Sequence, residues 1–272
     1  MNVSIITVAY DKDLEFLKYN LKSINKFCKG FYKNIVVIDN HNNDCEKTES
    51  YLREIGQPYF VNKEAKFVKS GYVRQQYIKF MADKYMPENC DYIAWVDCDN
   101  IFIKNQPPEV YFKNSLPIMV KCKYEDIQNK LKELPKERRI NDQKAYKVWQ
   151  ETTSELVGFH VEYEYMQCMP FIYPVETQKR FREYLEGVHG KPLIEIIKDI
   201  PIMADANLIG AYCEKFEKEK FFWIDRGEYN DFGNFINNRR MFYGHYSNRK
   251  EHQASRYIDL SKENNIIENL FK

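Results

Sequence analysis

Four short apolar runs punctuate the first hundred residues, and they are rich in β-branched and aromatic side chains. These runs span residues 3–10, 34–40, 57–63 and 92–96. Segments with apolar residues at helical spacing separate them, the clearest being 13–28 and 71–85. Regular alternation of strand and helix predicts an α/β fold, with a doubly wound, mostly parallel central sheet flanked by helices.

The second half of the chain is less regular. Residues 124–151 are highly charged and predict a helical segment interrupted by Pro135, either a solvated excursion or a lid over a site. Beyond it, strand character is predicted for 163–174 and 220–225, and helices for 175–188 and 203–216. No internal repeat or linker is present. We therefore predict one domain over 1–272, in which the regular first half (1–105) is followed by a less regular second half (106–272).

Charge and cysteine content narrow the possible functions. Lys and Arg number 41 against 40 Asp and Glu, so no global field favours nucleic acid or an anionic membrane as partner. The 7 cysteines are scattered without zinc-site spacing, which favours reduced thiols. No apolar run approaches the length of a transmembrane helix. These features predict a soluble, cytoplasmic protein without a transmembrane segment.

Polar side chains recur where the predicted strands end. They are Thr7, Asp11, Asp39, Asp97 and Asp99. In doubly wound sheets, ligands bind beyond the carboxyl ends of the strands. We therefore expect these residues to converge on one site.

The stretch "DYIAWVDCDN" (91–100) ends an apolar strand with two carboxylates, Asp97 and Asp99. Like charges this close repel one another, so we expect a positive group between them. Carboxylate oxygens suit hard cations such as Mg²⁺ and Mn²⁺, whose open positions accept phosphate oxygens. The alternative is a solvated turn with Asn100 as its turn residue. The position at a strand end favours the metal site.

The order of these motifs resembles the GT-A glycosyltransferases, whose hallmark is an Asp-x-Asp metal motif. "TVAYDKD", from Thr7, stands at the place of the base-binding loop, and "VVIDN" ends a second strand in Asp39. "GYVRQQYIKFMADKY" is similar to the helix before the metal strand, although Arg74 is followed by Gln75 where the family usually has Asn. The resemblance covers about the first hundred residues and thins beyond 120. In size and composition the chain also resembles glycosyltransferases of large algal viruses.

The resemblance implies a hexosyltransferase-type enzyme that uses Mn²⁺ or Mg²⁺. Its donor would be a nucleoside diphosphate sugar, such as a UDP- or GDP-sugar, and its acceptor a glycan, a glycoprotein or a small hydroxyl compound. The implied nucleotide-binding residues are Thr7, Val8, Ala9, Tyr10, Asp39, Arg74, Asp97 and Cys98. The implied metal ligands are Asp97, Asp99 and His245, with His252 as the alternative histidine.

An inverting transferase also needs a general base for the acceptor hydroxyl. The resemblance implies that Asp205, at the start of the predicted helix 203–216, is this base. Asp is also a favoured helix N-cap, which is the structural alternative. Glu162 and Glu164 are competing candidates, and strand alternation predicts that both lie on one face. A retaining mechanism stays open.

Two other functions compete with the transferase. A sugar-nucleotide pyrophosphorylase also combines a nucleotide fold with metal carboxylates, but its Gly-rich loop is absent after "ITVAY". A non-catalytic nucleotide-sugar-binding scaffold is the second alternative. The intact Asp-x-Asp pair favours the enzyme over both.

Overall fold

The computed structural model describes residues 1–40, 45–133, 135–167, 169–228, 241–245 and 257–259. The strands are β1 (Val3–Ala9), β2 (Asn34–Asp39), β3 (Tyr59–Asn62), β4 (Tyr92–Trp95), β5 (Asn100–Phe102), β6 (Phe112–Lys113), β7 (Leu116–Lys123), β8 (Tyr163–Glu164), β9 (Phe171–Pro174), β10 (Phe222–Asp225), β11 (Met241–His245) and β12 (Tyr257–Asp259). The helices are α1 (Leu14–Phe27), α2 (Glu46–Glu54), α3 (Gly71–Phe80), α4 (Tyr124–Leu131), α5 (Lys136–Val157), α6 (Val175–His189), α7 (Leu193–Ile197) and α8 (Asp205–Phe216).

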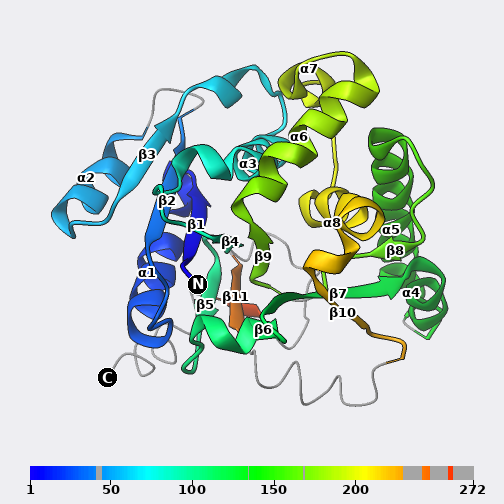
Figure 1. The fold of residues 1–272 in the computed structure, drawn as a ribbon, viewed down its shortest axis with the longest axis horizontal. Coiled ribbons are helices and arrows are strands. Elements are labelled where there is room, and N and C mark those ends of the chain that lie inside the picture. Colours follow the sequence, from blue (N-terminus) through cyan, green and yellow to red (C-terminus); the bar gives the residue numbers. More distant parts are fainter. Residues whose placement is uncertain (41–44, 134, 168, 229–240, 246–256, 260–272) are drawn as a thin grey trace.

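The central sheet has five strands in the order β3-β2-β1-β4-β9 (Figure 1). The first four run parallel to their neighbours, and β9 pairs antiparallel with β4. In the register, Ile6 of β1 lies between Ile35 of β2 and Trp95 of β4. This confirms the predicted α/β fold with a mostly parallel sheet flanked by helices, an arrangement compatible with a Rossmann-like fold.

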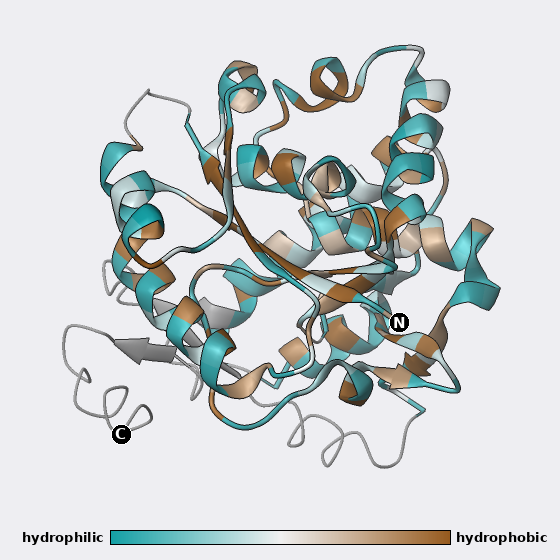
Figure 2. Cartoon of the chain, turned by 60° about the vertical axis from the view of Figure 1, so that its left-hand side comes forward, coloured by the Kyte–Doolittle hydropathy of each residue, from teal (hydrophilic) through white to brown (hydrophobic). Residues whose placement is uncertain are grey.

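Strands β1, β2, β4 and β9 of the central sheet are buried on both faces, because they are apolar at nearly every position, whereas the edge strand β3 is partly exposed. Alternate residues point to opposite faces. Ile6 and Val8 pack with α3 and α6 on one side, whereas Ile5 packs with Ile24 of α1 on the other. Figure 2 shows hydrophobic strands crossing the middle of the molecule between helices with hydrophilic outer turns. Continuous apolar runs rather than alternating ones are therefore what this sheet requires.

The second half builds around β7 and α8. Strand β7 pairs with β10, β6 and β8, and α8 packs against α3, α5 and α6. The charged segment 124–151 forms α4 and most of α5, whose last turn buries Leu156 and Val157. Since β9 joins the central sheet, the two halves share one core.

Strands β5 and β7 lie where the sequence pattern gives no clear strand. Directly after the carboxylates, β5 pairs antiparallel with β11, with Asn100 opposite Tyr243. Strand β7 contains Pro117 close to its start, where proline costs little pairing. The pairing of β5 brings the backbone of a C-terminal strand beside the end of β4.

In the part of the chain that the structure describes, no helix is both long and apolar enough to cross a bilayer. The six cysteines in that part are unpaired thiols, as the spacing predicts: Cys28, Cys45, Cys90, Cys98, Cys122 and Cys213.

Candidate functional site

The candidate site lies where the strand order reverses, between β1 and β4. The chain leaves β1 toward β2 on one side, while β4 lies on the other, so the loops after β1 and β4 part and form a crevice. The first loop carries Asp13 at the start of α1, and the second carries Asp97 and Asp99. The predicted carboxylate pair is thus at the ligand-binding edge of the sheet.

The positive group at this edge is Lys79, which the sequence analysis did not identify. Its Nζ lies 2.5 Å from Asp97 Oδ1 and 2.8 Å from Asp205 Oδ2. The side chain is only 4% exposed. Burial alone would lower the pKa of Lys79, but the charges of Asp205 and Asp97 outweigh burial and raise it. Lys79 therefore links the metal motif to α8 in the second half.

Three contacts fix the helix that carries Lys79. Ser70 caps α3 by accepting a hydrogen bond from the backbone N–H of Val73. Arg74 pairs with Asp39 at the end of β2, with 2.9 Å between Nε and Oδ2. Gln76 Nε2 donates to the carbonyl of Met203 at 2.9 Å. Residues 74, 76 and 79 thus attach α3 to both halves of the molecule.

Asp99 is the least compensated carboxylate of the site. Burial, and then the charges of Asp97 and Asp13, raise the pKa of Asp99 to about 8 from its ordinary value of 3.8. The pKa of Asp13 is raised as well, mainly by burial, although hydrogen bonds from Tyr10 and Cys98 oppose the shift. Among the described residues, Asp99 forms no ion pair. The site is short of positive charge.

Arg74 and Asp39 form a closed pair behind this edge. Arg74 Nη1 also donates to the carbonyls of Val68 and Lys69, at 3.2 and 3.3 Å. Asp39 Oδ1 is buried and has no hydrogen-bond partner in the described part of the chain. An unpaired buried oxygen is costly, and it is the one acceptor of this pair left for a ligand.

The other residues expected to contact the nucleotide differ in accessibility. Thr7, Val8 and Ala9 are buried within β1, and Tyr10 is the first residue after the strand to be partly exposed. Cys98 is buried, and burial raises the pKa of its thiol well above the ordinary value, so it is not a thiolate. Of these five residues, Tyr10 is therefore the one whose side chain is accessible to a nucleotide.

Asp11, expected at the site from its position after β1, has another role. Its Oδ1 accepts hydrogen bonds from the hydroxyl and backbone N–H of Thr48, at 2.6 and 3.2 Å. These bonds hold the first turn of α2 against the loop. The residue that faces Asp99 is Asp13, two positions later. The sequence alone did not favour Asp13 over Asp11, because both acids follow the same strand, β1.

Asp205 is the carboxylate of the second half that the structure brings to this edge. It is the first residue of α8 and 5% exposed, and the cap position belongs to Ala204. Its Oδ1 accepts from the backbone N–H of Ala206 at 2.7 Å, while Oδ2 binds Lys79. The alternative that Asp205 is the N-cap of this helix is therefore wrong, because Ala204 occupies the N-cap position one residue earlier.

Tyr72 stands on the same helix as Lys79 and is 44% exposed. Partial burial, followed by the charge of Asp205, raises its pKa to about 12, so the phenol stays protonated. Its ring is the exposed aromatic surface of α3 next to the carboxylates.

Glu162 and Glu164 do not share a face, so that expectation is wrong. Strand β8 is only Tyr163–Glu164, and Glu162 precedes it as an exposed residue. Glu164 is buried and accepts a hydrogen bond from the backbone N–H of Met166 at 3.0 Å. Burial raises its pKa to about 7. It belongs to the interior of the second half.

The two histidine candidates are placed only in part. His245 ends β11, which pairs antiparallel with β5 in a register that sets Tyr243 opposite Asn100. His252 lies outside the described residues.

The chemistry of the carboxylates suits a hard divalent cation. Four carboxylates, those of Asp13, Asp97, Asp99 and Asp205, surround or adjoin one ammonium, that of Lys79. Oxygen ligands and surplus negative charge are what Mn²⁺ or Mg²⁺ requires. Within the described ranges, however, no cluster of three His, Cys, Asp or Glu side chains is placed to hold a metal. Asp97 and Asp99 would hold such an ion together with water or phosphate oxygens.

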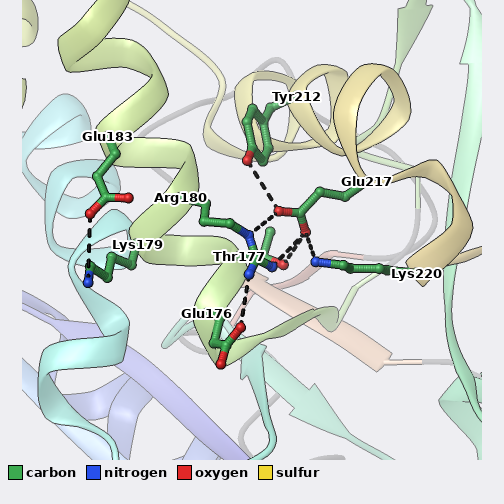
Figure 3. A network of polar contacts seen from close by, with 8 residues as sticks. All are labelled: Glu176, Thr177, Lys179, Arg180, Glu183, Tyr212, Glu217 and Lys220. Carbon is green, nitrogen blue, oxygen red and sulfur yellow. Dashed lines mark hydrogen bonds and ion pairs between the residues drawn. The ribbon is translucent and has the colours of Figure 1, made fainter.

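The opposite edge of the central sheet has different chemistry. A cavity of about 920 Å³ lies there, lined by Tyr92, Phe112 and Val175 among others. Beside it, Glu217 accepts hydrogen bonds from Thr177, Arg180 and Tyr212, and pairs with Lys220 (Figure 3). Its charged groups are largely paired with one another, so we place the functional site at the carboxyl edge despite this cavity.

No protein-family model matches the chain, and no curated protein matches it significantly. Any functional conclusion therefore depends on the geometry of the site.

Proposed function

We propose that this protein is a divalent-cation-dependent glycosyltransferase that moves a sugar from a nucleoside diphosphate sugar to a hydroxyl acceptor. One observation carries the proposal: two neighbouring carboxylates, Asp97 paired with Lys79 and Asp99 without an ion pair in the described part of the chain, follow β4 at the reversal point of a parallel sheet. That is where nucleotides bind in such sheets. The GT-A resemblance of the first hundred residues agrees with this position.

In the proposed reaction, Asp97 and Asp99 would hold Mn²⁺ or Mg²⁺. When bound, such a cation neutralises the charge that develops on the leaving phosphate. Tyr10, which is partly exposed after β1, would contact the base, and the buried Asp39 Oδ1 is an acceptor without a partner among the described residues. The ion pair between Arg74 and Asp39 holds the first turn of α3 against the end of β2.

Asp205 is the proposed general base of an inverting displacement. Each of its oxygens already accepts one hydrogen bond and keeps a second lone pair for the proton of an acceptor hydroxyl. As the attacking oxygen bonds to the anomeric carbon, the bond to the diphosphate breaks and the proton passes to Asp205. Tyr72 offers an exposed ring for an acceptor sugar.

Calorimetry with UDP, GDP, ADP and CMP, in Mn²⁺ and in EDTA, tests the proposal. We expect one diphosphate to bind in Mn²⁺ only, and the Asp97→Asn/Asp99→Asn variant to lose that binding. Asp91→Asn is the matched control, since Asp91 is exposed at the other end of β4. The sugar nucleotide of the bound diphosphate should then be hydrolysed slowly without an acceptor. Binding without any turnover would favour the scaffold, and turnover only with pyrophosphate would favour the pyrophosphorylase.

A further inference from the structure

Lys79 occupies the centre of the candidate site, where a metal-dependent enzyme needs its carboxylates free. The ammonium contacts Asp97 and Asp205, as described above, and its Nζ lies 6.0 Å from the centroid of the Trp95 ring. Trp95 ends β4 and Asp97 follows it directly in the next loop, whereas Asp205 starts α8 in the second half. A buried ammonium between two carboxylates is itself a cation site that is filled by the chain.

Lys79 cannot withdraw by a movement of its helix. Gln76, one turn earlier, binds the carbonyl of Met203, and Arg74 binds Asp39. Both contacts are buried, so α3 is fixed to β2 and to the segment before α8. Only the side chain of Lys79 can rearrange, and any rearrangement must leave Asp97 or Asp205 without its partner.

We propose that Lys79 is a built-in counter-ion that competes with the divalent cation for Asp97 and so sets the metal affinity of the site. The inference rests on the proposed function, because it assumes that Asp97 and Asp99 hold the metal. In the metal-free protein the ammonium neutralises Asp97 and Asp205. An entering cation meets this fixed positive charge at close range, in surroundings that screen charge poorly. Full use of Asp97 as a ligand requires Lys79 to release Asp97 Oδ1 and to keep Asp205.

Mn²⁺ titration of the nucleotide-free protein by calorimetry tests the competition directly. We expect Lys79→Met to bind Mn²⁺ about tenfold tighter or more, since one positive charge beside the ligands is removed. Lys79→Arg should bind as the wild type does, because it keeps the charge. Lys121→Met is the matched control: Lys121 also pairs with a carboxylate, that of Glu214, but in the second half. Equal or weaker Mn²⁺ binding by folded Lys79→Met, or no Mn²⁺ binding by either protein, overturns the inference.

Thermal unfolding gives a second readout that a purely structural lysine would not produce. Lys79→Met leaves the buried carboxylate of Asp205 and the partly buried one of Asp97 without their cation, so its melting temperature should fall without metal. Saturating Mn²⁺ should then raise it by more than it raises that of the wild type, since stabilisation grows with affinity. If Lys79→Met does not fold, Lys79→Met/Asp205→Asn removes both charges of the second pair. This double variant should show a smaller gain in Mn²⁺ affinity in the same direction, and no gain contradicts the inference.

Failure of the inference and failure of the proposed function give different results. Mn²⁺-dependent nucleotide binding by the wild type, with unchanged Mn²⁺ affinity in Lys79→Met, leaves the transferase standing and removes the competition. Tighter Mn²⁺ binding by Lys79→Met, with no nucleotide binding by either protein, keeps the competition and removes the transferase.

Discussion

Glu217 and Asp99 are both poorly solvated carboxylates, but their surroundings shift their pKa values in opposite directions. Glu217 is 3% exposed, and burial alone would raise its pKa. Hydrogen bonds from Arg180 and Thr177 outweigh burial and hold the pKa of Glu217 below its usual range. Asp99 forms no ion pair in the described part of the chain, and burial followed by the charges of Asp97 and Asp13 raises its pKa to about 8. The charge of Glu217 is balanced by cations of the chain, whereas Asp99 has no ion pair among the described residues.

The opposite pKa shifts distinguish Glu217, a carboxylate with a structural role, from Asp99, a carboxylate of the candidate site. Figure 3 shows Glu217 held by residues of α6 and α8 and by Lys220, so that its role is complete within the fold. Asp99 costs stability in the metal-free protein, as groups at functional sites commonly do. Substitution should therefore weaken the fold at Glu217 and strengthen it at Asp99.

Glu217→Gln should have the largest effect on stability. The variant leaves Arg180 without its buried anion, which we expect to cost about 3 kcal/mol in the free energy of unfolding. Urea unfolding followed by circular dichroism measures this loss. Glu219→Gln is the control, because Glu219 is exposed two residues away. A loss no larger than that of the control would show that the Glu217 network adds little.

Asp99→Asn should stabilise the metal-free protein. The amide removes a charge that burial and Asp97 disfavour, and we expect a gain of about 1–2 kcal/mol near neutral pH. The same urea experiment in EDTA measures it. With Mn²⁺ present, the wild type should recover the difference, because only its carboxylate binds the ion. A destabilised variant in EDTA would mean that Asp99 is already satisfied by the chain.

The two carboxylates should also give opposite pH dependences. The pKa of Glu217 is lowered in the folded protein, so its stabilisation is present above about 4.5 and is lost as the pH falls further. The pKa of Asp99 is raised, so its cost appears above about 3.8 and is complete above about 8. In EDTA, the advantage of Asp99→Asn over the wild type should therefore grow from about pH 4 to about pH 8. A constant advantage over this range would contradict the shift.

Lys179→Ala should have the smallest effect. Lys179 and Glu183 form an exposed pair on α6, 3.7 Å apart, at the edge of the same network (Figure 3). Exposed pairs of this kind contribute less than about 0.5 kcal/mol. Thermal unfolding in low and high salt checks this expectation. A large loss would mean that the network extends beyond Glu217 to the surface.

Much of the first half could be predicted from sequence because its elements are locally determined. Buried parallel strands such as β1 and β2 need continuous apolar runs, and helices such as α1 need apolar residues at helical spacing. Strand β7 escaped prediction because its pairing partners, β10, β6 and β8, are distant or very short, and lysines interrupt its apolar residues. Its strand structure depends on those partners rather than on its own pattern.

The site could be predicted only in part. Asp97 and Asp99 were found because they end an apolar strand, and Asp205 because it begins an apolar helix. Lys79 was missed because a lysine in a helix usually faces solvent. One signal was available: Arg74 and Lys79 are the only basic residues of α3, the helix before a strand that ends in two acids. Which acid each would meet depends on tertiary packing.

The bridge formed by Lys79 also has a consequence for the order in which the molecule assembles. Lys79 and Asp97 are 18 residues apart, whereas Lys79 and Asp205 are 126 apart. Chains synthesised from the N-terminus can form the first contact long before α8 leaves the ribosome. The second contact requires closure of a long loop, which is the slower kind of event in folding. The contact between Lys79 and Asp205 can therefore form only after the second half of the chain has packed against the first.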